Sequence, residues 1–208
     1  MARSASSIVS AIGLGASVVT TLITVPILLR YLGPEPYGVW LTIAGAAAWL
    51  GLVQIGLAPS LLNQLAAATG RDDEVLAKRL VSTAWWYQTG ISVALSAAAI
   101  VAFSAIPWAR VLNTDAATAA AGHAAATVVA VGIMLSLPAT IPVAAFRALQ
   151  QGYVAAAWDV TRNITRLAAV LLVVQLDGGM AGLAFAWVGP QLVVGALAAG
   201  HLFLFRHP

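Results

Sequence analysis

The sequence contains little charge and no cysteine. Only 8% of its 208 residues are Asp, Glu, Lys or Arg, whereas charged residues make up about 25% of an ordinary soluble domain. Without cysteine the chain forms no disulfide and offers no thiolate to a metal or to a covalent reaction. Hydrophobic residues supply 61% of the chain, and its mean hydropathy is +0.93. This composition indicates an integral membrane protein.

The sequence also lacks the residue groupings that carry catalysis. It has no paired nucleophile and base, no glycine-rich phosphate loop and no cluster at metal-ligand spacing. We therefore expect neither an enzyme nor a cofactor or metal site. The net charge is +3, but the basic residues are scattered between apolar runs. We interpret them as determinants of membrane topology and expect no nucleic-acid partner.

Long apolar runs predict an all-α fold, a polytopic transmembrane bundle of about six helices that fills the chain as a single lobe. A spanning helix needs about 20 residues. The first run exceeds the roughly 7 to 15 apolar residues of a signal peptide, so we expect it to be retained as a helix. The predicted spans are residues 8–29, 38–57, 80–105, 123–146, 157–176 and 180–205.

A polar turn separates the first two predicted spans. Residues 33–36 read Gly-Pro-Glu-Pro, and because proline lacks an amide donor we expect the chain to reverse direction here. Tyr37 and Trp40 follow with amphipathic rings that suit a membrane boundary. Arg30 would then lie at the mouth of whatever the helices enclose.

Basic residues are distributed unequally between the two ends of the predicted spans. By the positive-inside rule the richer end faces the cytoplasm, which places both termini there and the Arg30 turn outside. The richer end has six, Arg3, Arg71, Lys78, Arg79, Arg147 and Arg206, and the other end has Arg30 and Arg110.

The fourth predicted span contains two prolines. Pro138 and Pro142 are four residues apart and so lie on the same face of a helix. A helix that loses two backbone donors on one side is expected to be a hinge or a broken segment.

The fifth predicted span carries charge. Residues 167–176 are apolar but reach only about 15 Å as a helix, against a hydrocarbon core of roughly 30 Å. The span must therefore begin near Trp158 or earlier. Four polar residues then lie on one stripe within the span: Asp159, Arg162, Asn163 and Arg166.

The stripe allows two interpretations. Arg162 either extends to the cytoplasmic headgroups with Asp159 neutralising it, or lines a cavity. Arg166 lies about 12 Å along the helix from Trp158, and a charge at that depth normally faces a bundle interior or a water-filled cavity. Gln54 in the second span is either a helix-to-helix hydrogen bond or a polar cavity contact.

Three segments resemble a known family. Residues 28–40, 50–63 and 146–153 are similar to signatures of polysaccharide flippases, the lipid-linked oligosaccharide exporters of the multidrug, oligosaccharidyl-lipid and polysaccharide exporter (MOP) superfamily. The resemblance implies two helical lobes that rock about a central cavity. Family members usually have twelve or more spans, so this chain resembles an amino-terminal lobe, which a second lobe or a homodimer would complete.

The resemblance also implies a substrate and a location. A cationic cavity would accept the pyrophosphate of an undecaprenyl-type lipid carrier in a bacterial cytoplasmic membrane. Guanidinium groups suit phosphate, so Arg162 and Arg166 would bind the head group. Arg30 would lie at the outer mouth, and Asn163 and Gln54 would be polar contacts. Many relatives carry an acidic residue near the Gln54 position, and its absence bears on proton coupling.

Two alternatives stay open. A drug or cation antiporter of the same superfamily would need buried carboxylates, and Asp159 is the one that the apolar runs offer. A non-transporting membrane scaffold, or a truncated product, would need no cavity.

Overall fold

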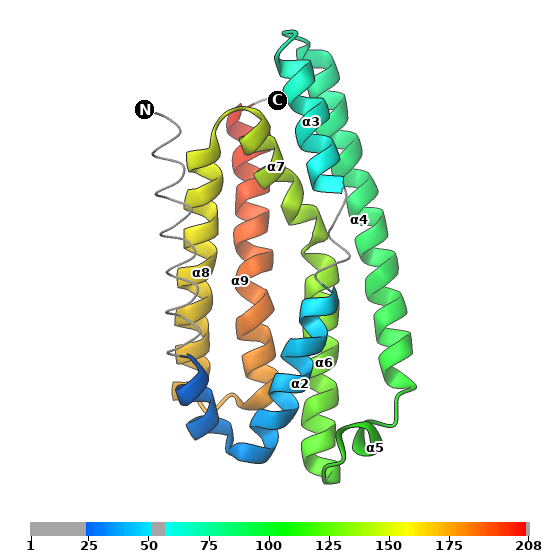
Figure 1. Cartoon of the computed structure of the whole chain (residues 1–208), viewed down its shortest axis with the longest axis vertical. Coiled ribbons are helices and arrows are strands. Elements are labelled where there is room, and N and C mark those ends of the chain that lie inside the picture. The colour runs from blue at the N-terminus through cyan, green and yellow to red at the C-terminus, as the bar shows by residue number, and fades with distance from the viewer. Residues whose placement is uncertain (1–23, 51–56, 207–208) are drawn as a thin grey trace.

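The computed structural model describes residues 24–50 and 57–206, and its regular elements in these ranges are all helical (Figure 1). The predicted all-α class is confirmed. Beyond a helical segment over 24–32, the elements are α2 (Pro34–Leu50), α3 (Leu57–Thr69), α4 (Glu74–Ser104), α5 (Trp108–Leu112), α6 (Ala116–Leu135), the 3-10 helix η2 (Leu137–Ala139), α7 (Thr140–Ala148), α8 (Gly152–Gln175), α9 (Gly179–His201) and the π-helix η3 (Leu202–Arg206).

Three of the described helices are long and apolar enough to cross a membrane: Glu74–Ser104, Ala116–Leu135 and Gly179–Leu204. Large apolar side chains also cover the outside of the bundle, where Trp49 is 75% exposed and Val101 is 70% exposed. Apolar surface of this extent is suited to lipid. The fold is that of a multi-pass membrane protein.

The connections between helices gather at two ends of the bundle. The α3–α4 turn, the α7–α8 turn and η3 lie at one end, and α5 and the α8–α9 turn lie at the other (Figure 1). Arg71, Lys78 and Arg147 belong to the first end, and Arg110 belongs to the second. This division matches the alternation used to predict topology. Which end faces the cytoplasm stays a prediction.

The turn before α2 is shorter than the sequence suggested. Gly33 alone breaks the helical path, with φ +78°, a conformation that glycine adopts without a steric penalty. Pro34 then begins α2, because the first turn of a helix does not need the amide that proline lacks. The Tyr31 hydroxyl accepts a hydrogen bond of 2.7 Å from the Gly179 amide, which joins this turn to the α8–α9 turn.

Helix bounds differ from the predicted spans in places. α4 begins at Glu74, before residue 80, because Asp73 caps it by accepting from the Leu76 amide. α6 begins at Ala116, where Asp115 accepts from the Thr118 amide at 2.7 Å, and this bond lowers the pKa of the Asp115 carboxyl. Residues 8–23 of the first predicted span lie outside the described residues.

The predicted span over 123–146 is divided by a break. α6 ends at Leu135, η2 follows, and α7 starts at Thr140. Pro138 lacks the amide hydrogen that the Met134 carbonyl, four residues earlier, would accept in a helix. Ser92 of α4 replaces it, since its Oγ donates to that carbonyl at 2.6 Å. Serine side chains commonly satisfy such carbonyls in membrane helices.

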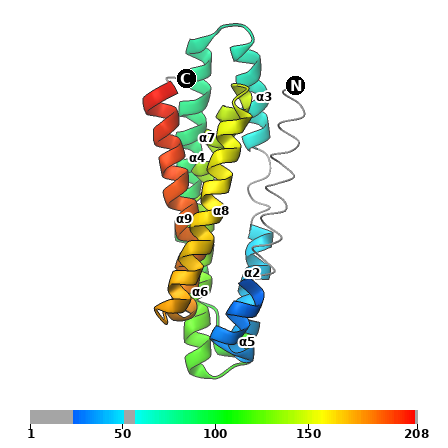
Figure 2. The same cartoon turned by 90° about the vertical axis from the view of Figure 1, so that its left-hand side faces the viewer.

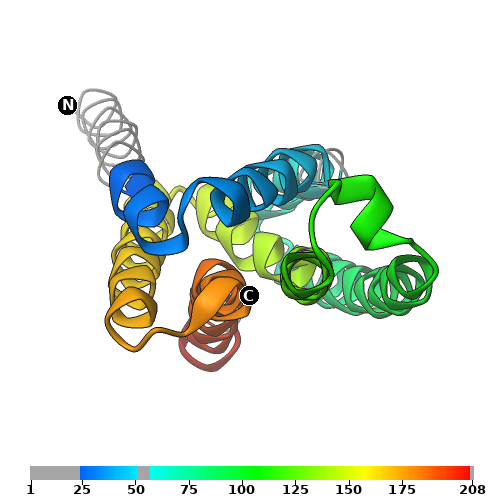
Figure 3. The same ribbon diagram turned by 90° about the horizontal axis from the view of Figure 1, so that it is seen from below.

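The break separates two apolar cores. α6 lies between α2, α4 and α9 (Figure 3), and the first core forms around it, whereas the second forms where α3, α4, α7 and η3 meet. The first core includes Val39, Ile43, Val129, Ile133 and Leu183. The second includes Leu65, Val81, Ile141, Phe146 and Leu202.

Small residues bring α9 very close to the broken helix. A Cβ on Gly132 would lie 2.5 Å from Cγ2 of Val188, and a Cβ on Gly195 would overlap the Cβ of Ala139. Close approach of this kind is how helices associate in lipid, where burial of apolar surface gives no advantage. α8 runs beside α9 on its other side (Figure 2).

We predict that Gly195→Ala destabilises the protein by about 1–3 kcal/mol, because an added methyl overpacks the contact with Ala139. Gly189→Ala, in the same helix, is the control. Nothing lies within 4 Å of the added Cβ there, and the substitution should be neutral or slightly stabilising. Thermal unfolding of both variants in detergent measures the difference, and equal melting temperatures would contradict the close packing.

Candidate functional site

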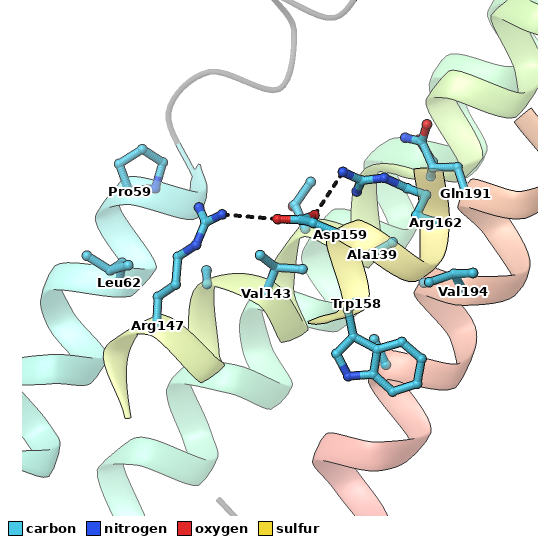
Figure 4. Close-up of a pocket in the computed structure, with 15 residues that line it drawn as sticks. Pro59, Leu62, Ala139, Val143, Arg147, Trp158, Asp159, Arg162, Gln191 and Val194 are labelled. Atoms are coloured by element: carbon cyan, nitrogen blue, oxygen red, sulfur yellow. Dashed lines mark hydrogen bonds and ion pairs between the residues drawn. The ribbon is translucent and has the colours of Figure 1, made fainter. Parts of the chain in front are cut away.

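A cavity of about 560 Å³ lies beside the helix break (Figure 4). Its walls come from α3, α7, α8 and α9, together with Ser136 and Ala139 of the break itself. Since the break turns the chain away from the axis of α6, it leaves the space between these helices. The volume falls within the range of about 300–1,000 Å³ that small-molecule sites usually have.

One wall of the cavity is charged. Nη2 of Arg162 lies 2.8 Å from Oδ1 of Asp159, one helical turn earlier in α8. Nη2 of Arg147, in α7, lies 3.5 Å from Oδ2 of the same carboxylate (Figure 4). Two guanidinium groups share one carboxylate, so this wall is net positive. The three side chains are 31 to 55% exposed and accessible from the cavity.

Another wall is neutral and hydrogen-bonding. Nε2 of Gln191 in α9 donates to Oγ of Ser136 at 2.7 Å, and that hydroxyl donates to the Ile133 carbonyl at 2.7 Å. The Thr140 hydroxyl donates to the Leu137 carbonyl at 2.8 Å. The two hydroxyl groups satisfy backbone carbonyls at the break, and all three side chains line the cavity.

An aromatic group completes the lining. The indole Nε1 of Trp158 donates to Nδ1 of His201 at 3.4 Å, and the His201 ring packs against Phe146 with centroids 5.2 Å apart. Trp158 therefore presents a fixed apolar face to the cavity from α8.

The structure places the predicted α8 residues as follows. α8 begins at Gly152, before Trp158, as the length argument required. Arg162 both pairs with Asp159 and lines the cavity, and its extension to the headgroups stays a prediction. Asn163 and Arg166 are half-buried on α8 and are not among the residues that line the cavity.

The remaining predicted residues are elsewhere. Arg30 is exposed in the helical segment 24–32, which leads into α2 at the end of the bundle away from the α7–α8 turn (Figure 1). Gln54 lies outside the described residues. Pro138 and Pro142 are buried at the break, so the broken segment is present, and its use as a hinge stays a prediction.

Sequence reasoning missed Arg147, Ser136 and Gln191. Arg147 lies one residue beyond the predicted span over 123–146 and entered the sequence analysis only as a topology determinant, but it belongs to the last turn of α7. A serine two residues before Pro138 was a usable signal, because a proline in an apolar helix needs nearby hydroxyl groups for its freed carbonyls. Gln191 looked like any other lone amide, and its partner was visible only in the folded chain.

The groups that line the cavity suit the binding of a polar or anionic ligand. Guanidinium groups offer paired donors to phosphate or carboxylate oxygens, and the amide and hydroxyl groups suit a polar neutral ligand. Within residues 24–50 and 57–206, no group of three or more His, Asp or Glu side chains is placed to hold a metal ion.

A bundle of membrane helices with a broken helix beside a polar cavity is typical of membrane transporters. The chain is similar to solved transporter structures. An outward-facing multidrug resistance MATE family transporter of the MOP superfamily matches with a TM-score of 0.78 and 18% identity, over 96% of this chain and 44% of the transporter. A MATE protein in complex with MaD3S matches with a TM-score of 0.78 and 17% identity, over 96% of this chain and 45% of that protein.

A third structure is a MOP superfamily transporter from Pyrococcus furiosus, for which the reversed polarity of the binding pocket suggests a different function. It matches with a TM-score of 0.78 and 17% identity, over 96% of this chain and 44% of that protein. The chain therefore spans less than half the length of these proteins and has the fold of one lobe of a MOP superfamily transporter. At this identity the likeness establishes the fold alone. No protein-family model and no curated protein sequence matches the chain.

We predict that Asp159→Asn strengthens the binding of inorganic pyrophosphate by about tenfold at low salt, because it removes the carboxylate that the two arginines share. Arg162→Gln should weaken binding by a similar factor, and both effects should shrink as salt rises. Asp177→Asn, the same charge change in the exposed α8–α9 turn, is the control. Isothermal titration calorimetry measures all three, and equal effects of the two Asp→Asn changes would contradict the site.

Proposed function

We propose that this chain is one lobe of a membrane transporter that moves an anionic, lipid-linked oligosaccharide across the bilayer by alternating access. The observation that carries the proposal is the convergence of Arg147 and Arg162 on the single carboxylate of Asp159 in the cavity wall. A net positive wall favours a substrate with a phosphate or diphosphate group.

Arg166 supports a path for such an anion along α8. It lies four residues beyond Arg162 on the same face, is half-buried, and has no ion pair with any carboxylate of the described residues. A charge in a membrane-spanning stretch normally faces a bundle interior or a polar pathway. Arg162 and Arg166 together form a cationic stripe that an anion would follow from the cavity toward the middle of the helix.

The neutral wall suits the sugar portion of such a substrate. Gln191, Ser136 and Thr140 provide an amide and two hydroxyl groups, which exchange hydrogen bonds readily with sugar hydroxyls. The face of Trp158 provides the apolar surface on which a sugar ring packs. The proline break supplies a place where α7 bends relative to α6, as movement of the cavity between the two sides of the membrane requires.

We predict that Arg162→Ala and Arg166→Ala each slow the flipping of a fluorescent diphosphate-linked oligosaccharide lipid by about tenfold or more, since each removes a charge-assisted hydrogen bond to the head group. The test uses the complete transporter, with whatever second lobe it needs, in reconstituted vesicles. Arg79→Ala, an exposed arginine of α4, is the matched control and should keep the original rate. Unchanged flipping in Arg166→Ala would show that the stripe is not a substrate path.

A drug or cation antiporter is the second candidate, and the observation that favours it is the carboxylate of Asp159 in the cavity wall. In that case Asp159→Asn would abolish the efflux of a cationic dye driven by a pH or sodium gradient, because the group that takes the cation is lost. The flippase proposal predicts instead that the variant still binds the diphosphate lipid. Gradient-driven dye efflux that depends on Asp159 would overturn our choice, and a scaffold would show neither activity.

A further inference from the structure

Two hydrogen bonds from neighbouring helices hold the helix break on different sides. From α4, Ser92 Oγ donates to the Met134 carbonyl at 2.6 Å. From α9, Gln191 Nε2 donates to Ser136 Oγ at 2.7 Å. Ser136 passes this support on, because its own hydroxyl donates to the Ile133 carbonyl. The last turn of α6 is therefore tied to both α4 and α9 at the point where Pro138 interrupts it.

The two hydrogen bonds, called the α4 tie and the α9 tie, differ in their accessibility to a ligand in the cavity. Ser92 is only 1% exposed and is not part of the cavity wall. Gln191 is half-buried and lines the cavity together with Ser136. Ser136 is itself only 1% exposed, so the Gln191 amide is the group of this pair that a ligand can reach. Gln191 and Arg162 line the same cavity (Figure 4), so an anion held by the cationic wall would share this space with the Gln191 amide. A ligand in the cavity can therefore compete for the α9 tie but not for the α4 tie.

The competition favours a charged ligand. Ser136 Oγ is a neutral acceptor for the Gln191 amide, whereas a phosphate oxygen is a charged acceptor and forms a stronger hydrogen bond. A bound phosphate exchanges one acceptor for a better one, so Gln191 loses nothing when it leaves Ser136. The break then loses its polar tie to α9, although its own Ser136 hydroxyl remains.

The packing around Gln191 limits this loosening to the break. Val188, Gln191 and Gly195 lie on one face of α9. Val188 packs against Gly132 before the break, and Gly195 packs against Ala139 within it. Apolar contact holds α9 against α6 at Gly132 and against η2 at Ala139 whether or not the amide is bonded. The hydrogen bond from the Gln191 amide to Ser136 supplies the polar connection between α9 and the start of the break.

From this arrangement we propose that the Gln191–Ser136 hydrogen bond acts as a latch on the helix break. An anionic ligand opens the latch by accepting the hydrogen bond of the Gln191 amide, and α7 is then free to move about Pro138. The ligand step depends on the proposed function, since it requires an anion to enter the cavity. The mechanical step does not, because removing the amide should loosen the break in the absence of any ligand.

The first experiment tests the mechanical step without ligand. Hydrogen–deuterium exchange is followed in the complete protein in nanodiscs for the wild type, Gln191→Met and Gln175→Met. Gln191→Met keeps the length of the side chain and removes its donor, and should speed exchange of the α7 amides about tenfold. Gln175→Met, at the exposed end of α8, should leave them unchanged. Wild-type exchange in Gln191→Met would overturn the latch.

The second experiment tests the ligand step with geranyl diphosphate, a short prenyl diphosphate. The probe should speed α7 exchange in the wild type and in Ser92→Ala, whose tie lies outside the cavity, but add nothing in Gln191→Met or Ser136→Ala. An equal response in all four proteins would overturn the coupling. If calorimetry detects no binding of the probe to the wild type, the proposed substrate class and the ligand step both fail, while the first experiment still decides the mechanical step.

Discussion

The carbonyl of Met134 cannot accept the hydrogen bond that residue 138 would donate in a continuous α-helix, because residue 138 is proline. In a bilayer an unsatisfied carbonyl costs several kcal/mol, so another group must supply a hydrogen. Ser92 does so, and this requirement fixes the position of α4 along α6. The break that remains divides the apolar interior into two cores and leaves the cavity between α3, α7, α8 and α9. The missing donor at Pro138 is thus a local cause of the break beside which the cavity lies.

Two of the charged residues of α8, Asp159 and Arg162, face this cavity. Asp159 accepts from Arg162 on its own helix and from Arg147 across the cavity mouth, so the ion pairs join α7 to α8 beside the break. All three groups remain partly exposed, and exposed ion pairs contribute little to stability. The folding of the lobe therefore depends little on these three charges. The two closest contacts of α9, at Gly132 and Gly195, provide the rigidity that the charged wall does not.

The sequence predicted features that depend on local chemistry. Apolar run lengths predicted the helices, the spacing of Pro138 and Pro142 predicted the broken segment, and the short apolar part of α8 predicted that Arg162 lies within it. Features that depend on two distant segments were not predictable. Nothing local shows that Arg147 reaches Asp159, or that Gln191 meets Ser136, since both depend on how α7, α8 and α9 pack. The single-residue turn at Gly33 was missed because proline was taken as a helix breaker, although it is accepted in a first turn.

The similarity to solved transporters shows which features the fold requires. At 17 to 18% identity the backbone is still alike over 96% of the chain, so the fold depends on the pattern of apolar runs and breaks more than on particular side chains. The polar wall is independent of that pattern. Arg147, Asp159 and Arg162 are partly exposed, and replacing them would change the sign of the cavity while the cores and the α6–α9 contact stayed intact. The fold therefore identifies no substrate, and any inference about a ligand must start from the residues of the cavity.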